Sequence, residues 1–165
     1  MDNMSKHNIL TTLLTRQIQQ VNELFVLLRQ EYQELRGGHA EKIEQISLEK
    51  SILLNELKNL EQEQQQFIQS TLLKHEKPSI AQVIICIAPQ NPEALTALNE
   101  ELTQQAKECH KQNQINGIVI SMNQQFTDKA LAILHGQDPT AVTQLIYGPN
   151  GQTETKIRHN SLTKV

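Results

Sequence analysis

The sequence predicts an all-α fold, an elongated antiparallel bundle of a helical hairpin and one long third helix, followed by a flexible C-terminal tail. Leu and Ile recur at steps of three and four over long stretches, which is the period of a helix with one apolar face. Aromatic residues make up 3% of the 165 residues, and compact cores usually draw much of their area from aromatics. We therefore expect a helical domain over 1–135 and a tail over 136–165.

The first helix is expected over 5–36. Its apolar residues fall on one face at helical spacing: Leu10, Leu14, Val21, Leu24, Leu28 and Leu35. A second row, Ile18, Phe25 and Tyr32, recurs every seven residues beside the first. This apolar face is wider than a two-stranded coiled coil needs, so it can serve two neighbouring helices.

Gly37 and Gly38 then predict a turn, because two consecutive glycines cost about 2 kcal/mol relative to Ala inside a helix. A second, antiparallel helix is expected over 40–73. Its apolar row is Ile43, Ile46, Leu53, Leu57, Leu60 and Phe67. Lys50 and Gln64 occupy two positions of the same row. A Lys is tolerated there because its stem packs while its ammonium reaches water.

Residues 74–92 break the pattern with three prolines, Pro78, Pro89 and Pro92. Between them, IAQVIICIA (80–88) is the most apolar stretch of the chain. It is a short buried helix or strand, or an exposed apolar patch. We expect burial, because a long exposed apolar run favours aggregation.

The third helix is expected over 92–134, with an apolar row of Leu95, Leu98, Leu102, Ala106 and Cys109. Asn113, Asn116 and Gly117 interrupt this row, and Gly117 would permit close approach of another backbone. His135 and Gly136 end the helix, as Gly commonly does. The residues beyond have no sustained period, which predicts a flexible tail.

Bulk properties exclude several classes of protein. The net charge is −3 and the pI about 6.1, so the electrostatic footprint of a nucleic-acid binder is absent. The longest apolar run, VIICIA (83–88), is far shorter than the roughly 20 residues that span a bilayer. The N-terminus has no apolar core typical of a signal peptide. Cys86 and Cys109 are expected to be free, buried thiols, with a disulfide as the alternative.

No catalytic site and no cofactor are expected. The sequence has no Gly-rich phosphate loop, HExxH, CxxC or GxSxG motif. Cys109 and His110 could donate to a metal, but neighbours in a helix point to different faces, so no metal site is expected. Glu61 and Glu63 lie on the polar side of the second helix and are expected to be solvated.

Three features could carry function. The first is the apolar face of the third helix at Val119, Ile120, Phe126, Leu131 and Leu134, which is either bundle core or a ridge for a partner helix. The second is the pair Asn113 and Asn116, either solvated or a buried polar layer that fixes packing register. The third is Tyr147, either part of a tail without a role or an aromatic that inserts into a partner's pocket.

The ordered combination of three segments resembles the FlgN family of flagellar type III export chaperones. These are EKSILLNELKNLEQE (49–63), QNQINGIVI (112–120) and YGPNGQT (147–153), followed by a basic end, KIRHNSLTKV. The resemblance covers nearly the whole chain and implies a cytoplasmic protein without catalytic activity. It also implies binding to the C-terminal helical segments of the hook-filament junction proteins FlgK and FlgL, which would otherwise associate prematurely.

The resemblance assigns residues to two partners. The end of the third helix and the tail would bind the client, at Val119, Ile120, Phe126, Leu131 and Leu134. Tyr147 of the Tyr-Gly motif would contact the export gate protein FlhA. Gly148 and Gly151 would let the tail turn into the gate's pocket.

Two other classes compete with a secretion chaperone. A coiled-coil scaffold or tether would self-associate through the apolar rows of the first two helices and bind no secretion client. An enzyme would need catalytic groups assembled from the first and third helices, and nothing in the sequence marks such groups.

Overall fold

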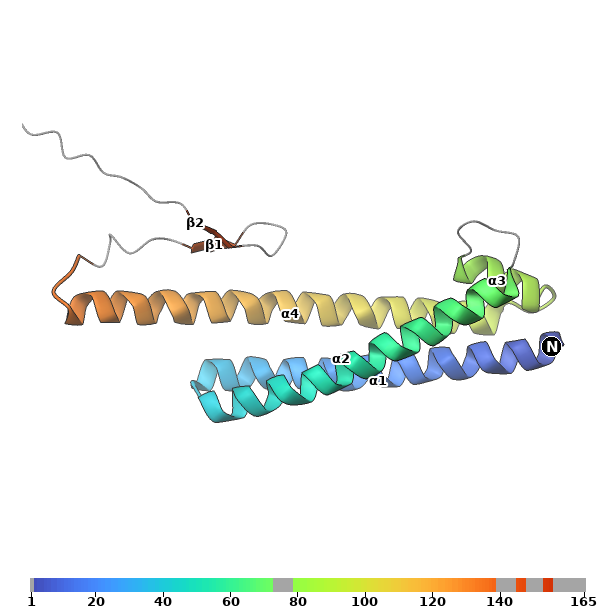
Figure 1. The fold of residues 1–165 in the computed structure, drawn as a ribbon, viewed down its shortest axis with the longest axis horizontal. Coiled ribbons are helices and arrows are strands. Elements are labelled where there is room, and N and C mark those ends of the chain that lie inside the picture. The colour runs from blue at the N-terminus through green and yellow to red at the C-terminus, as the bar shows by residue number, and fades with distance from the viewer. Residues whose placement is uncertain (1, 73–78, 139–144, 148–152, 156–165) are drawn as a thin grey trace, which may run out of the picture. The chain divides into compact units, whose positions relative to one another are not determined.

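Four helices and one two-stranded sheet make up the part of the chain that the structure describes (Figure 1). The computed structural model describes residues 2–72, 79–138, 145–147 and 153–155, with side chains described through residue 138. The helices are α1 (Asn3–Gly37), α2 (Ala40–Thr71), α3 (Ile80–Ile87) and α4 (Glu93–Leu134). The expected all-α class is confirmed, and the three long helices begin and end within two residues of the expected bounds. The chain divides into two units, Met1–Asn116 and Gly117–Val165.

The hairpin of α1 and α2 turns at the predicted glycines. Asp2 caps the start of α1 by accepting a hydrogen bond from the Ser5 amide at 2.8 Å. At the other end Gly38 has φ 71°, in the left-handed region that favours glycine. The amide of His39 reaches back to the Glu34 carbonyl at 3.2 Å, which satisfies one of the free carbonyls of the helix end.

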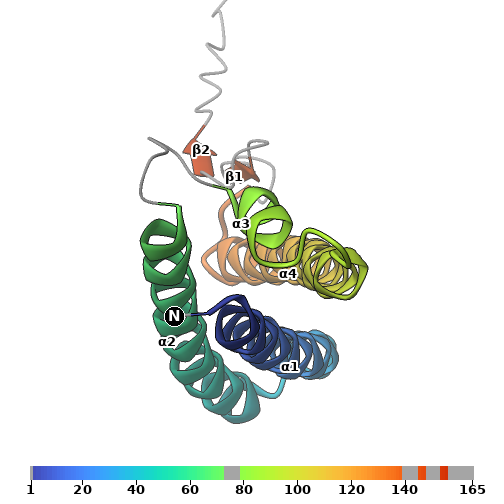
Figure 2. The same ribbon diagram turned by 90° about the vertical axis from the view of Figure 1, so that its right-hand side faces the viewer.

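The first unit has its main core where the N-terminal half of α1 meets the other three helices. Figure 2 views these helices end-on. This core consists of Leu10, Leu14, Ile68, Val83, Ile84, Ile87 and Leu95. A smaller cluster further along α1 contains Val21, Leu28 and Cys109. The face of α1 therefore does serve more than one neighbour, as its width predicted.

The apolar rows of the two hairpin helices are largely confirmed. Leu10, Leu14, Leu28, Leu53 and Leu60 are buried, while Leu57 is half-buried. Ile68 is buried as well, although the expected row placed Phe67 there. Two polar residues of α1, Gln17 and Glu31, are buried in the same face and were not predicted.

The apolar segment 80–88 is a helix, α3, and its burial is confirmed at Val83, Ile84 and Ile87. Its start carries a capping box: Ser79 Oγ accepts from the Gln82 amide, and the Gln82 side chain accepts from the Ser79 amide. The outer face exposes Ile85 and Cys86. The expected burial of Cys86 was therefore wrong, because an eight-residue helix packed on one side leaves the other side in water.

Gly136 and Gly117 have different roles. Gly136 lies two residues beyond Leu134, the last residue of α4, and has φ 68°, as a helix stop should. A Cβ atom at Gly117 would meet nothing within 4 Å. The expected close backbone approach at Gly117 is therefore wrong.

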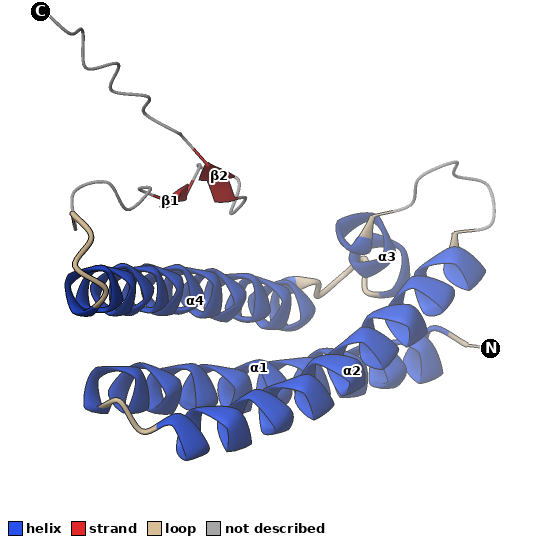
Figure 3. Cartoon of the chain, turned by 60° about the vertical axis from the view of Figure 1, so that its left-hand side comes forward, coloured by secondary structure: helices blue, strands red, loops and turns tan. Residues whose placement is uncertain are grey.

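A short antiparallel ladder follows α4 in the sequence. β1 (Leu145–Tyr147) pairs with β2 (Thr153–Thr155), so that Tyr147 lies opposite Thr153 (Figure 3). The sequence did not predict this pairing. The rest of the expected tail beyond residue 138 lies outside the described residues.

Candidate partner-binding surfaces

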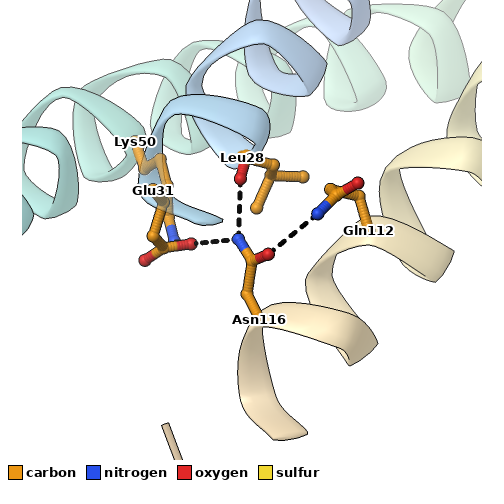
Figure 4. A network of polar contacts seen from close by, with 5 residues as sticks. All are labelled: Leu28, Glu31, Lys50, Gln112 and Asn116. Atoms are coloured by element: carbon orange, nitrogen blue, oxygen red, sulfur yellow. Dashed lines mark hydrogen bonds and ion pairs between the residues drawn. The ribbon is translucent and has the colours of Figure 1, made fainter. Parts of the chain in front are cut away.

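A buried polar layer joins three helices of the first unit around Asn116 (Figure 4). The Asn116 side chain is 1% exposed. Its Nδ2 donates to the Leu28 carbonyl and to Glu31 Oε2, each at 2.8 Å. Its Oδ1 accepts from Gln112 Nε2 at 2.9 Å. The amide thus uses both of its protons and one lone pair, which is what a buried Asn requires.

The second half of this polar layer is an ion pair across the hairpin. Lys50 Nζ lies 2.7 Å from both carboxylate oxygens of Glu31. The two side chains are 17% and 7% exposed. A buried carboxylate is costly unless it is paired and hydrogen-bonded, and Glu31 receives both Lys50 and Asn116. The place of Lys50 in the apolar row had suggested that its ammonium reaches water. The ammonium instead binds Glu31.

A second polar contact matches the first in register. Gln64 Nε2 of α2 donates to Gln17 Oε1 of α1 at 3.1 Å. Gln17 and Glu31 lie 14 residues apart, and so do Lys50 and Gln64. Sliding one helix by a heptad would place at least one of these polar groups opposite an apolar side chain, so the two layers specify one antiparallel register.

The two asparagines singled out in the sequence therefore have different places. Asn116 belongs to a buried polar layer that fixes packing, which was one of the two alternatives. Asn113 is exposed, which was the other. Three residues turn α4 by about 300°, which leaves the two side chains about 60° apart. Asn116 faces α1, and Asn113 lies outside that contact.

Beyond Asn116, α4 carries a stripe of exposed apolar side chains. This apolar stripe of α4 consists of Ile118, Met122, Phe126 and Ile133, with Phe126 80% exposed. The spacings of four, four and seven residues place the four side chains on one face. Ile118, Met122 and Ile133 were not predicted as site residues, although their spacing is visible in the sequence.

The five residues proposed for client binding do not form one row. Phe126, Leu131 and Leu134 are exposed, whereas Val119 and Ile120 are half-buried. By helical rotation Phe126 belongs with the apolar stripe, while Leu131 and Leu134 lie on another side of α4. The helix therefore offers exposed apolar groups on more than one side.

The proposed export-gate residues are described only in part. Tyr147 is the last residue of β1 and pairs with Thr153. Gly148 and Gly151 lie outside the described residues.

The described part of the chain contains two thiols and no clustered metal ligands. No group of three or more His, Cys, Asp or Glu side chains that could hold a metal ion occurs there. Cys86 and Cys109 are both free, as expected. Burial raises the pKa of the Cys109 thiol, whose Sγ donates to the Val21 carbonyl at 3.3 Å. None of the helices within the described ranges is both long and apolar enough to cross a membrane.

Comparison with known proteins decides the family. A family model described as FlgN protein matches residues 1–155. The chain belongs to the FlgN family. Neither the curated proteins nor the solved structures contain a significant match.

Membership in the FlgN family gives the exposed surfaces a context. FlgN proteins are flagellar export chaperones, and the family is not one of enzymes. A chaperone needs surfaces that are left open for other proteins. In this FlgN protein α4 exposes apolar side chains, whereas the polar layer at Asn116 is buried where three helices pack.

Proposed function

We propose that this protein is a cytoplasmic export chaperone for the hook-filament junction proteins FlgK and FlgL. It would bind their C-terminal helical segments, keep them from associating prematurely, and deliver them to the export gate protein FlhA. Family membership supports the general role. The choice of clients and gate rests on the family resemblance of the sequence.

The exposed apolar groups of α4 are the observation that carries the proposal. Phe126 and Leu134 are each 80% exposed. Phe126 belongs to the apolar stripe of α4, and Leu134 lies on another side of the helix. Exposed apolar surface marks an interaction site, and amphipathic helices bind such surfaces through apolar residues at helical spacing. We propose that the client helix docks at Phe126, Leu131 and Leu134, with Val119 and Ile120 contributing where they are accessible.

Delivery would use the Tyr-Gly segment. Tyr147 is the only aromatic residue of 136–165. Tyrosine buries a large area while few rotamers are frozen, so it suits a contact that must form and release. Gly148 and Gly151 would allow the chain to bend as Tyr147 enters the gate.

The test is a titration of purified C-terminal segments of FlgK and FlgL against wild type, Phe126→Ser and Leu131→Ser. Each substitution should weaken binding about tenfold or more, as expected for a residue central to an interface. Ile52→Ser is the matched control, because Ile52 is an exposed apolar residue of α2 and is 62% exposed. It should leave client affinity unchanged.

Two results would count against the proposal. If Phe126→Ser and Leu131→Ser lower the melting temperature as much as a core substitution, these residues contribute to the core. If wild type forms no complex with either segment and instead self-associates permanently in sedimentation, the chain is a scaffold.

A further inference from the structure

The hairpin of α1 and α2 carries a groove that the chaperone role above does not use. The groove has a volume of about 530 Å³. Its walls include Glu23, Val26 and Gln30 of α1 and Glu49, Ile52 and Glu56 of α2. All six side chains are exposed. We call this feature the acidic groove.

The floor and rim of the acidic groove are apolar where a partner would enter. Val26 is 53% exposed and Ile52 62% exposed. Leu48, one turn before Ile52 in α2, continues this exposed apolar surface. A partner that covers these aliphatic side chains removes apolar surface from water, which favours binding.

Three carboxylates border this apolar floor, and none of them is ion-paired. Glu23 accepts a hydrogen bond from Gln19, Glu49 from Gln45, and Glu56 from Gln20. All three donors are neutral amides. The groove therefore keeps three uncompensated negative charges.

Two neighbouring carboxylates of the same hairpin do have cationic partners. Beyond one end of the groove, Glu63 lies 3.5 Å from Arg16. Beyond the other end, Glu31 binds Lys50 at 2.7 Å. The hairpin thus supplies cations on both sides of the groove but none to the groove itself.

The positions of the three carboxylates define a charge pattern. The Gln20–Glu56 hydrogen bond crosses from α1 to α2 at 3.0 Å, which places Glu56 beside the Glu23 end of the α1 wall. Glu49 lies next to Lys50, whose ammonium contacts Glu31, so it borders the Gln30 end. Two negative charges therefore lie at one end and one at the other, separated by the seven residues from Glu23 to Gln30, or about 10 Å.

We propose that the acidic groove is a second docking site, for a basic amphipathic helix of another protein. About two turns of such a helix fit its length, with apolar residues at i and i+3 or i+4 covering Val26 and Ile52. Lys or Arg side chains near both ends of this segment would meet the three carboxylates. The site is separate in residues from the client surface of α4 and does not depend on it.

Charge argues against a second copy of this chain as the occupant. A two-fold interface centred on the groove would bring its own residues together. The three carboxylates of each copy would then face those of the other, and like charges across an interface cost several kcal/mol. A basic partner would be attracted to the three carboxylates, whereas a second copy would be repelled by them.

The experiment titrates an 18-residue helical peptide of Leu and Lys, with Leu at i, i+3 and i+4 spacing, against the full-length protein at low and high salt. A peptide with Glu in place of Lys is the control ligand. The double variant Glu23→Gln/Glu56→Gln should bind the Lys peptide about five- to tenfold more weakly. Ile52→Ser should weaken binding by about tenfold. The Glu peptide should not bind.

Matched variants separate this site from general attraction to an acidic protein. Glu100→Gln/Glu101→Gln removes two exposed carboxylates of α4 and should leave the affinity unchanged. Phe126→Ser, which tests the client surface, should also leave the affinity for the Lys peptide unchanged. The two proposals can therefore fail independently of each other.

Three outcomes would overturn the proposal. The first is an equal loss in the Glu100→Gln/Glu101→Gln protein, which would show unspecific charge attraction. The second is unchanged affinity in Glu23→Gln/Glu56→Gln. The third is a dimer in sedimentation that Ile52→Ser dissociates, which would make a second copy the occupant. All substituted side chains are exposed, so the variants should fold, and their melting curves check this.

Discussion

Asn116 Nδ2 of α4 donates a hydrogen bond to Glu31 Oε2 of α1 at 2.8 Å, in a position where both side chains are buried. The same nitrogen donates to the Leu28 carbonyl. One amide thus satisfies a buried carboxylate and holds α4 against the main chain of α1. Through Glu31 the contact extends to Lys50 on α2, so that all three long helices meet in one polar layer.

The first prediction concerns this amide. Asn116→Ala removes the donor to Glu31 and to Leu28, and each buried polar group left without a partner costs about 1–3 kcal/mol. We expect the free energy of unfolding to fall by about 2 kcal/mol or more in urea denaturation. Asn113→Ala, three residues away on the exposed side of α4, is the matched control and should change it by less than about 0.5 kcal/mol. Equal effects of the two substitutions would contradict the polar layer.

The ion pair gives a second prediction. Lys50→Met leaves Glu31 as a buried carboxylate without its cation and should destabilise the protein by about 3 kcal/mol, toward the lower end of the range for broken buried pairs because Lys50 keeps 17% exposure. Glu31→Leu/Lys50→Met removes the charge as well and should recover most of this loss. Part of the cost remains, because one Asn116 proton loses its acceptor. Denaturant curves of both proteins decide; a double variant less stable than Lys50→Met would contradict the argument.

The apolar row of α2 gives a third prediction. Leu53 is 5% exposed in the hairpin. Leu53→Ala should cost about 2–5 kcal/mol, because the removed atoms leave a cavity as well as lost burial. Leu54, the next residue, is half exposed, and Leu54→Ala should have little effect. Thermal melts followed by circular dichroism compare the two, and an unchanged melt of Leu53→Ala would show that this register of α2 is wrong.

Helical periodicity predicted the long helices because each buries an aliphatic stripe over many turns. Leu14, Leu28 and Leu53 are buried where their spacing placed them. The turn at Gly37 and Gly38 was predicted for a similarly local reason, since consecutive glycines are unfavourable inside a helix. Such features depend on neighbours in the sequence, and one sequence is enough to reveal them.

Features that depend on pairing between distant residues were missed or left open. Glu31 and Gln17 are polar, so periodicity assigns them to solvent, and only their partners Lys50 and Gln64 make burial acceptable. The place of Asn116 stayed open between two alternatives for the same reason. The acidic groove was also missed, because its two walls come from helices that run antiparallel.

The two thiols give a fourth prediction. Cys86 is exposed, whereas Cys109 is buried and has a raised pKa caused by that burial. The thiolate is the reactive form. In native protein at neutral pH, Cys86 should therefore react with an aromatic disulfide reagent much faster than Cys109. Cys86→Ser should abolish the fast phase, and Cys109→Ser should leave it unchanged. In denaturant both should react at similar rates; a fast Cys109 in the native protein would contradict its burial.

The fifth prediction concerns Tyr147, which ends β1 opposite Thr153. We expect Tyr147→Ala to lower the affinity of the client-loaded protein for the cytoplasmic domain of FlhA by about 1–3 kcal/mol, because truncating an aromatic that fills a partner's pocket costs energy of this size. Helicity and client affinity should not change. Ile146→Ala is the matched control: Ile146 precedes Tyr147 in the same strand, and its truncation should leave the affinity for the gate domain unchanged. Titration of the gate domain against the three proteins measures the difference, and equal affinities would exclude Tyr147 from gate binding while leaving the client surface of α4 untouched.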